Sequence, residues 1–336
     1  MSKIDLILRN TVETITRPEL DKLLRSRKKP SVYIGAAPTG KVHIGYYIQA
    51  VKLKDFIDAG LDVKYMLADI HAYLDNRKSP WNLTKARSKY YKEAMTAILK
   101  SIGADTKKVE FILGSSFQQK KDYIFDLYKI MGLVKLKRAM RASSEVVRQV
   151  ENPDLGSLNY ALMQSIDVHH IDADIAYSGI DQRKIYMLAR EEAPKLGHKK
   201  PICIFTPLVG LSKGGGKMSA SEAQSAIYID DSPTTVAKKI GKAYCPEGVI
   251  EGNGVLDMVR HVVFPVDGKI DIVRPAKFGG NKTYLELDSL EKDFKTKKIH
   301  PADLKSSLAT VFNRYLAIVH KHFKNKKSII NEAYPK

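Results

Sequence analysis

The sequence predicts an α/β fold built on an open, doubly wound parallel sheet, followed by a second domain that is mainly helical. Short apolar runs alternate with longer amphipathic segments, as expected where helices connect the parallel strands of a sheet. A run of small residues follows the first apolar run and leads into a helix start, which is typical of the strand–turn–helix units of such sheets. The last third of the chain is rich in lysine, and its patterns favour helices.

The first half of the chain supplies most elements of the predicted sheet. We expect paired helices in residues 1–24, strands at 31–35, 63–68 and 109–114, and helices at 43–57 and 81–103. The run at 63–68 is apolar throughout, which is typical of a parallel strand buried on both faces. Ligands of such a sheet lie at the carboxyl ends of its strands.

Two further features divide the chain. Residues 117–150 are predicted to be helical and to interrupt the sheet between its halves, as an insertion spanning about 116–152, before another strand at 203–205. Ser232-Pro233 follows a polar loop and is a helix-start signal. We therefore expect one domain in residues 1–230 and a mainly helical one in residues 231–336.

The stretch Tyr33-Ile-Gly-Ala-Ala-Pro-Thr-Gly-Lys-Val-His-Ile-Gly-Tyr46 has the outline of a nucleotide site. Gly40 and Gly45 let a ligand approach the backbone. Free N–H groups at the following helix start, together with the positive end of the helix dipole, favour an anion. His43 adds a hydrogen-bond donor. A plain strand, turn and helix with an incidental histidine explains the same residues, so both interpretations stay open for this stretch alone.

A second candidate for phosphate binding lies far downstream, in Gly214-Gly-Gly-Lys-Met-Ser-Ala-Ser221. By itself a glycine-rich loop with one lysine is more often a solvated linker. Together, the two stretches resemble the signature motifs of class I aminoacyl-tRNA synthetases, His-Ile-Gly-His and Lys-Met-Ser-Lys-Ser, in the order that the family shows. Tyr46 replaces the final histidine of the first motif, and Ala220 replaces the second lysine of the other. Both changes are similar to the archaeal and eukaryotic cytosolic tyrosyl branch.

The resemblance to class I synthetases implies roles for residues in both motifs. It implies that His43, Lys217 and Ser219 are catalytic. It also implies a set of ATP-binding residues: Thr39, Gly40, His43, Gly45, Tyr46, Lys217, Met218 and Ser219. Mg²⁺ would arrive with the triphosphate of ATP, and no metal bound by the protein itself is expected.

A third stretch carries a polar stripe. Tyr160, Gln164 and Asp167 are spaced four and three residues apart, so they share one face of a predicted helix. Such a stripe is usually the solvated side of a helix. Here apolar residues alternate with it: Leu162, Met163, Ile166 and Val168. The polar face is therefore expected to line an enclosed space, where a carboxylate and amides need partners that a bound phenol and ammonium group would supply.

This arrangement is similar to tyrosyl-tRNA synthetases. The resemblance implies that Tyr160, Gln164 and Gln182 hold the α-ammonium group of L-tyrosine, while Asp167 and Tyr33 bind its hydroxyl. It adds three further positions at the bound tyrosine: Gly35, Ala68 and His71. A site that hydrogen-bonds a substrate hydroxyl leaves its own polar groups unpaired when that hydroxyl is missing, so phenylalanine is rejected.

The resemblance extends along nearly the whole chain and implies partners. It implies a homodimer formed through the helical insertion, and contacts between tRNA(Tyr) and both domains. At the acceptor end of tRNA the expected residues are Arg138, Arg141, Arg183 and Lys184. Phe278 and Asp303 are expected at the first anticodon base, by stacking and by accepting hydrogen bonds. The alternatives are a core aromatic for Phe278 and a helix cap for Asp303.

Composition supports a polyanionic partner. The chain has 336 residues, and 56 Lys and Arg against 37 Asp and Glu give a net charge of +19. A chain that is merely rich in lysine would have the same charge. Two cysteines, Cys203 and Cys245, are too few for a disulfide framework or a zinc ligand set. With no long apolar run and no convincing targeting segment, we expect a cytoplasmic protein without membrane contact.

Three functional hypotheses follow. The first is tyrosine–tRNA ligase, which forms tyrosyl-adenylate from L-tyrosine and ATP and transfers the tyrosine to the terminal adenosine of tRNA(Tyr). The second is the related tryptophanyl enzyme, against which the Tyr33 and Asp167 pair argues, since an indole offers a single donor. The third is a synthetase-like RNA-binding module without catalysis, against which the retained His43, Gly45, Lys217 and Ser219 argue.

Overall fold

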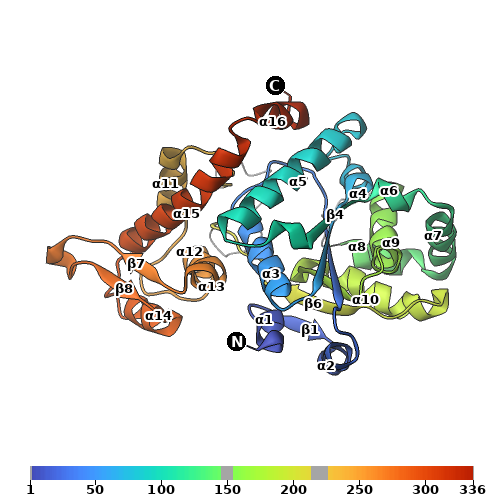
Figure 1. The fold of residues 1–336 in the computed structure, drawn as a ribbon, viewed down its shortest axis with the longest axis horizontal. Helices are drawn as coiled ribbons and strands as arrows, with labels where there is room; N and C mark the ends of the chain where they lie inside the picture. The colour runs from blue at the N-terminus through green and yellow to red at the C-terminus, as the bar shows by residue number, and fades with distance from the viewer. Residues whose placement is uncertain (1, 145–153, 213–225, 336) are drawn as a thin grey trace.

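The central element of the computed structural model, which describes residues 2–144, 154–212 and 226–335, is a six-stranded sheet between two layers of helices (Figure 1). The strand order is β1-β6-β5-β2-β3-β4, and every neighbouring pair is parallel except β1 with β6. The strands are β1 (Glu13–Ile15), β2 (Ser31–Ala36), β3 (Asp62–Leu67), β4 (Val109–Leu113), β5 (Ile175–Gly179) and β6 (Ile202–Thr206). The predicted α/β fold with a doubly wound sheet is confirmed.

The strand order explains where a ligand can bind. From β2 the chain runs outward through β3 to β4, and it then returns to the other side of β2 through β5 and β6. The connections on the two sides of β2 therefore diverge, which opens a crevice beyond the carboxyl ends of β2 and β5. Residues of β6 are all buried, as the apolar pattern of a central parallel strand requires.

The N-terminal segment differs from its prediction. Residues 1–24 were expected to be paired helices, but α1 (Lys3–Leu8) and α2 (Arg17–Ser26) are separated by β1, which extends the sheet at its edge. The Val12 N–H donates to the carbonyl of Phe205 at 2.8 Å where this pairing begins. A three-residue strand is too short to show alternation, so its pairing with β6 decides its structure.

Two layers of helices cover the sheet. In Figure 1, α3 (Tyr46–Asp58) and α5 (Thr84–Ser101) lie on one face, and α9 (Leu155–His170) and α10 (Arg183–Glu192) lie on the other. The short α4 (Asp69–Leu74) follows β3 directly. The helices predicted at 43–57 and 81–103 are thus present and begin at Tyr46 and Thr84, each after a tight turn.

The segment predicted as a helical insertion holds three helices in its described part. They are α6 (Ser115–Gln118), α7 (Lys121–Leu133) and α8 (Leu136–Ser143). Residues 145–153 of the same prediction lie outside the described residues. Several large apolar side chains of α7 and α8 are exposed: Phe125, Tyr128, Met131, Leu133, Leu136 and Met140.

The last part of the chain is mainly helical, as predicted, with a hairpin that was not predicted. Its elements are α11 (Pro233–Lys242), α12 (Gly254–Met258), α13 (Phe264–Asp267), β7 (Ile270–Ile272), β8 (Lys282–Tyr284), α14 (Leu287–Lys295), α15 (Pro301–Phe323) and α16 (Lys327–Ala333). Ser232 caps α11 by accepting a hydrogen bond from the Thr235 N–H. The domain boundary next to this cap stays a prediction.

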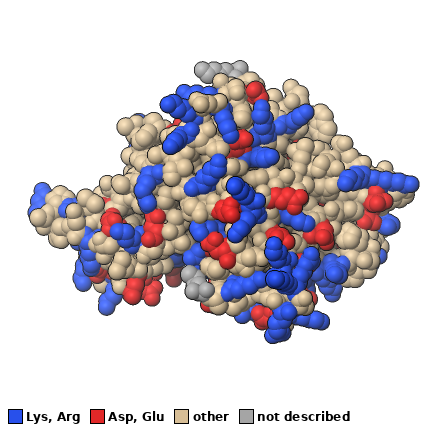
Figure 2. Space-filling view, viewed as in Figure 1, with Lys and Arg blue, Asp and Glu red and all other residues tan. Residues whose placement is uncertain are grey.

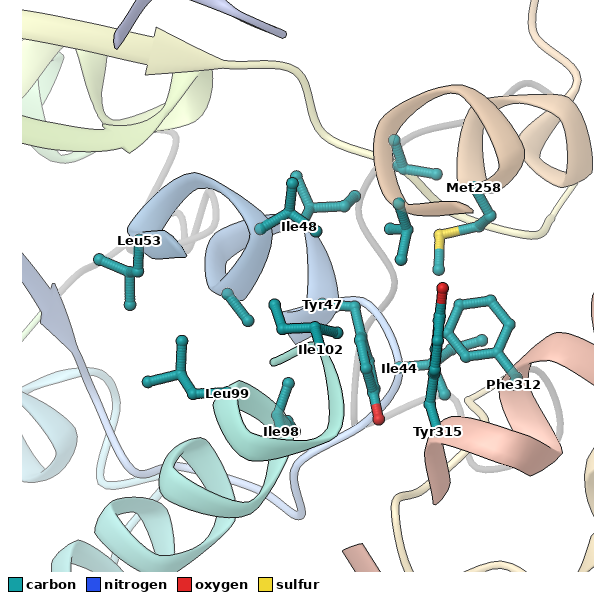
Figure 3. Packing of buried hydrophobic residues seen from close by; sticks show 14 of the residues in the cluster. Ile44, Tyr47, Ile48, Leu53, Ile98, Leu99, Ile102, Met258, Phe312 and Tyr315 are labelled. Carbon is teal, nitrogen blue, oxygen red and sulfur yellow. The ribbon is translucent and has the colours of Figure 1, made fainter. Parts of the chain in front are cut away.

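A continuous apolar core joins this helical part to the sheet (Figure 3). Tyr47 of α3 stacks on Tyr315 of α15 with ring centroids 5.6 Å apart, and it meets the edge of Phe312 at 5.4 Å. Met258 of α12 lies beside the same rings in Figure 3. Aromatic pairs of this kind contribute about 0.5–1.5 kcal/mol beyond their buried area. The helical part is thus held against α3, the helix that begins at the crevice.

Charge is distributed widely over the surface. Figure 2 shows lysine and arginine side chains across the whole visible face, with fewer acidic residues among them. Within residues 2–144, 154–212 and 226–335, no helix has the length and apolar character needed to cross a membrane.

Candidate functional site

A pocket of about 490 Å³ occupies the crevice at the carboxyl ends of β2 and β5. Its walls come from the turn after β2, the start of α3, the end of β3, and the helices α4 and α9. Most site residues predicted from the sequence line it: Tyr33, Gly35, Thr39, Gly40, His43, Gly45, Tyr46, Ala68, His71, Tyr160, Gln164 and Gln182. The stretches around Tyr33 and Tyr160, far apart in the sequence, therefore form one site.

The part of the pocket beside Tyr33 and His71 is its closed end. Asp167 lies next to His71 at this end; it is completely buried and is not itself among the residues that line the pocket. Its Oδ1 atom accepts hydrogen bonds from Gln118 Nε2 and from the Tyr123 hydroxyl, both at 2.8 Å. Its Oδ2 atom lies 3.4 Å from His71 Nε2, and neither of these two atoms has a hydrogen-bond partner among the described residues. One carboxylate oxygen is thus held by the protein, and the other is left for a donor.

Burial is the main influence on the protonation of the titratable side chains at this end. It raises the pKa of Asp167 to about 7, although the hydrogen bonds from Gln118 and Tyr123 work in the opposite direction. Burial also lowers the pKa of His71 to about 3, so this imidazole is neutral at physiological pH. The Tyr33 side chain is fully buried nearby, and burial raises the pKa of its hydroxyl, with further contributions from Tyr186 and Asp167. A hydroxyl donor would satisfy Asp167 and offset the cost of its buried charge.

Glycine is required where the chain passes this end. A Cβ atom on Gly35 would lie 3.1 Å from Met66 Cε and 3.2 Å from the Tyr33 hydroxyl. Both distances are tighter than ordinary van der Waals contacts. Gly35 therefore keeps the ring of Tyr33 in place and leaves room beside it.

The next part of the pocket gathers acceptor oxygens. Gln164 Nε2 donates to Gln182 Oε1 at 3.1 Å, and Gln164 Oε1 is buried without a partner among the described residues. Asp75 and Asp181 also line the pocket, and both influence the nearby hydroxyl of Tyr160 electrostatically. Amide and carboxylate oxygens in one place suit a cation such as an ammonium group.

The open end of the pocket is formed mainly by backbone. Tyr91 donates from its hydroxyl to the Gly40 carbonyl at 2.7 Å and accepts from the Tyr46 hydroxyl at 3.2 Å. The Gly45 N–H donates to His43 Nδ1 at 3.2 Å, and the rings of His43 and Tyr46 meet edge to face at 5.0 Å. Tyr46, which replaces the usual histidine of the motif, thus faces the pocket.

The amides at the start of α3 are not free, in contrast to the expectation from the sequence. The N–H groups at the start of α3 were expected to be free for an anion, but those of Tyr46, Tyr47 and Ile48 donate to the carbonyls three residues earlier. The glycine-containing turn tightens into this pattern, which satisfies the amides locally. Attraction for phosphate at α3 therefore rests on the helix dipole and on side chains.

Several residues of this site were not found from the sequence. Gln118 and Tyr123 hold Asp167, Asp75 and Asp181 add carboxylates, and Lys78 Nζ donates to Asp75 at 2.6 and 2.7 Å. The position of Gln118 offered one signal, because it ends α6, the short helix after β4, whose carboxyl end faces the crevice. The predicted residues Lys217, Met218 and Ser219 lie outside the described residues.

The basic residues predicted at the acceptor end of tRNA lie beside the second half of the sheet. Arg138 is paired with Glu191 at 2.9 Å and Arg183 with Glu13 at 2.6 Å. Lys184 Nζ donates to the Ser144 hydroxyl at 3.2 Å, and Arg141 is exposed. To bind a phosphate of tRNA, Arg138 and Arg183 would have to release the carboxylates with which they are paired.

The two residues predicted at the anticodon are both accessible. Phe278 is 59% exposed, so the alternative of a core aromatic is wrong. Asp303 lies in the first turn of α15, but the cap of that helix is His300, whose side chain accepts from the Ala302 N–H. The alternative of a helix cap for Asp303 is therefore wrong as well.

Comparisons with known proteins agree with this geometry. The model of the family described as tRNA synthetases class I (W and Y) matches residues 25–317. The tyrosine–tRNA ligase of Natronomonas pharaonis is 48% identical over 100% of this chain and 98% of its own length. The cytoplasmic tyrosine–tRNA ligase of Xenopus tropicalis is 42% identical over 99% of this chain and 63% of its own. The crystal structure of Archaeoglobus fulgidus tyrosyl-tRNA synthetase complexed with L-tyrosine is 41% identical, covers 95% of this chain and 98% of its own, and superposes with a TM-score of 0.89.

Proposed function

The chain belongs to the class I tRNA synthetases for tryptophan and tyrosine, and on this premise we propose that it is a tyrosine–tRNA ligase. It joins L-tyrosine to tRNA(Tyr) at the expense of ATP, through a tyrosyl-adenylate. The observation that carries this proposal is Asp167, a buried carboxylate with one oxygen held by Gln118 and Tyr123 and the other without a partner among the described residues.

Tyrosine would bind with its hydroxyl at the closed end of the pocket. The phenol would donate to Asp167 Oδ2 and lie beside Tyr33 and His71, with Gly35 and Ala68 against its ring. Phenylalanine would leave the Asp167 carboxylate unpaired, and an unpaired buried polar group costs about 1–3 kcal/mol, more for a charged one. The ammonium group would be held by Tyr160, Gln164 and Gln182, and the carboxylates of Asp75 and Asp181 add to their attraction.

ATP would occupy the open end. We propose that Thr39, Gly40, Gly45 and Tyr46 position the nucleotide so that the tyrosine carboxylate attacks its α-phosphate in line and releases pyrophosphate. His43 would donate a hydrogen bond to the charge that develops on the phosphates. The same role is proposed for Lys217 and Ser219 of the downstream motif, and Met218 is proposed to contact ATP. Mg²⁺, bound to the triphosphate, would neutralise part of its charge.

The tryptophanyl alternative fits the closed end poorly. An indole N–H can donate one hydrogen bond and cannot accept any. The closed end presents two polar groups close together: Asp167 Oδ2, which accepts, and the Tyr33 hydroxyl, which can donate or accept. A non-catalytic module would not need the pocket at all.

We further propose that tRNA binds across the basic surface of both parts of the chain. Arg138, Arg141, Arg183 and Lys184 would contact the acceptor end, which supports transfer of tyrosine to the terminal adenosine. Residues 231–336 would form the anticodon-binding domain. The exposed ring of Phe278 would stack on the first anticodon base, and Asp303 would accept its hydrogen bonds.

A homodimer and a cytoplasmic location are also proposed. The exposed apolar side chains of α7 and α8, among them Phe125, Tyr128 and Leu136, support an interface with a second copy of the chain. Tyr128→Asp should shift the mass measured by sedimentation towards one chain, whereas Leu285→Asp, at an exposed apolar residue between β8 and α14, should not. The cytoplasmic location is supported by the relative in Xenopus tropicalis, which carries that word in its name.

Pyrophosphate exchange with each amino acid, followed by charging of tRNA, tests the proposed function. We expect exchange with tyrosine alone, and charging of tRNA(Tyr). Exchange with tryptophan, or with no amino acid, would contradict the proposal. Asp303→Ala should weaken charging of tRNA(Tyr) and leave exchange nearly unchanged. Loss of both activities in that variant would instead indicate a structural role.

A further inference from the structure

A second cluster of polar side chains lies outside the pocket, where α7, the end of α9 and the segment after α10 meet. Asp126 on α7, His169 on α9 and His198 each offer one ligand atom, and these three atoms lie within 4.8 Å of one another. We propose that these residues bind a divalent transition-metal ion, with Zn²⁺ as the best match to two imidazoles and a carboxylate. This proposal departs from the expectation, made from the sequence, that the protein itself binds no metal; only the two cysteines were considered there as zinc ligands.

The spacing of the donors is close to what a metal requires. His198 Nε2 lies 3.0 Å from Asp126 Oδ2. Ligand atoms around tetrahedral zinc lie about 3.3 Å apart when each is about 2 Å from the ion. The rings of His169 and His198 are stacked, with centroids 3.5 Å apart and planes at 11°. In-plane lone pairs of two stacked imidazoles do not converge, so binding of one ion requires the exposed ring of His169 to rotate.

Two neighbours act on the carboxylate from outside the proposed ligand set. His170 Nε2 lies 3.2 Å from Asp126 Oδ2 and orients that oxygen, as outer partners of metal ligands commonly do. Lys129 Nζ donates to Asp126 Oδ1 at 2.9 Å, and its charge opposes a bound cation. The Lys129 side chain is 60% exposed, so it can turn away into solvent.

The position of the cluster indicates a structural role. Asp126 follows Tyr123 by one helical turn, and His169 comes two residues after Asp167. Tyr123 and Asp167 are hydrogen-bonded at 2.8 Å in the buried layer next to the closed end of the pocket. A metal ion bound by Asp126 of α7 and His169 of α9 would therefore hold these two helices together near the closed end of the pocket.

Titration of the full-length, tag-free chain with Co²⁺ after treatment with a chelator tests the proposal. We expect about one Co²⁺ per chain with the strong visible absorption of a four-coordinate site, displacement by Zn²⁺, and a higher Tm with Zn²⁺. His198→Ala and Asp126→Asn should each weaken Co²⁺ binding by about tenfold or more, while Lys129→Gln should tighten it.

Two further variants keep the test decisive. His322, with Glu93 and Lys326, resembles the cluster but has only one histidine, so His322→Ala should bind Co²⁺ as the parent does. His169→Gln changes an exposed residue and should fold even if His198→Ala does not. The proposal is overturned if the parent chain takes up no more Co²⁺ than His169→Gln, or if His322→Ala loses the same absorption.

Discussion

The two ends of the pocket differ in the kind of group that they present. At the closed end, buried side chains from three helices, His71, Gln118 and Asp167, leave polar atoms without partners among the described residues. At the open end, a turn and a helix start present backbone and hydroxyl groups that are already hydrogen-bonded, as in the Tyr46–Tyr91–Gly40 chain. The closed end thus needs a ligand to become satisfied, whereas the open end is satisfied without one.

Because of this difference, we expect the closed end to select the amino acid and the open end to promote the reaction with ATP. A buried atom without a partner penalises any ligand that fails to provide one, so the closed end discriminates between amino acids. Groups with their own hydrogen bonds stay in place whether or not a ligand is bound, which suits the positioning of ATP for in-line attack. We therefore expect variants at the closed end to change which amino acid is activated, and variants at the open end to change how fast.

The largest effect is expected for Asp167→Ala. The change removes a hydrogen bond to the substrate hydroxyl and leaves Gln118 and Tyr123 without their acceptor, so kcat/KM for tyrosine should fall by about 10²- to 10³-fold. Pyrophosphate exchange measures this. Circular dichroism should show an intact fold, and tyrosine activation at the parental rate would mean that the closed end is assigned wrongly.

A smaller effect of a different kind is expected for His43→Ala at the open end. Loss of one donor to charge that develops in the transition state should lower the rate of adenylate formation by about 10²-fold. Single-turnover kinetics and equilibrium dialysis separate this rate from tyrosine binding, which should keep its Kd. If His43→Ala instead binds tyrosine more weakly and forms the adenylate at the parental rate, the two ends do not differ in function as proposed.

The affinity for tyrosine should depend on pH through Asp167. Its pKa in the free protein is raised to about 7, and a phenol that donates to the carboxylate favours the ionised form. Protons therefore compete with tyrosine below pH 7, and affinity should fall by up to about tenfold for each further pH unit. Calorimetric titration between pH 5.5 and 8 would show this, and Asp167→Asn should remove the dependence. A flat profile in the parent would contradict the assignment.

The carboxyl group of Asp167 should also make the free energy of unfolding depend on pH, in the opposite direction to a carboxylate in a surface salt bridge. Because folding raises the pKa of Asp167 from 3.8 to about 7, the folded state holds the proton more tightly between these values. The contribution of Asp167 to the free energy of unfolding should therefore decline as pH rises through this window. Urea unfolding without tyrosine should show a smaller decline in Asp167→Asn than in the parent; identical declines would count against the raised pKa.

The smallest effect is expected for Tyr46→Phe. Its hydroxyl donates to Tyr91, and one net hydrogen bond contributes about 1 kcal/mol, so the KM for ATP should rise about fivefold. Exchange assays at varied ATP measure this. A loss as large as that of His43→Ala would mean that Tyr46 itself takes part in the chemistry.

Much of the sheet and of the closed end could be predicted from the sequence, because local patterns determine these features. The apolar runs of β2 and β3 and the polar stripe of Tyr160, Gln164 and Asp167 follow strand and helix periods directly. The edge strand β1 and the hairpin of β7 and β8 were missed because strands of three residues are too short to show a period.

Other features depend on contacts between distant segments. Gln118 and Tyr123 meet Asp167 across more than 40 residues of sequence, and nothing in their own surroundings marks them as its partners. The satisfied amides at the start of α3 depend on how tightly the turn after β2 closes. Such features follow from tertiary packing, which a local period does not encode.

The ratio of kcat/KM for tyrosine over phenylalanine in pyrophosphate exchange tests the central claim most directly. It should be measured in the parent, in Asp167→Ala and in His43→Ala under one set of conditions. We expect the ratio to fall steeply in Asp167→Ala and to stay at the parental value in His43→Ala, although both variants are slow. An unchanged ratio in Asp167→Ala, or an equal fall in both, would contradict the division of the pocket into a selective end and a reactive end.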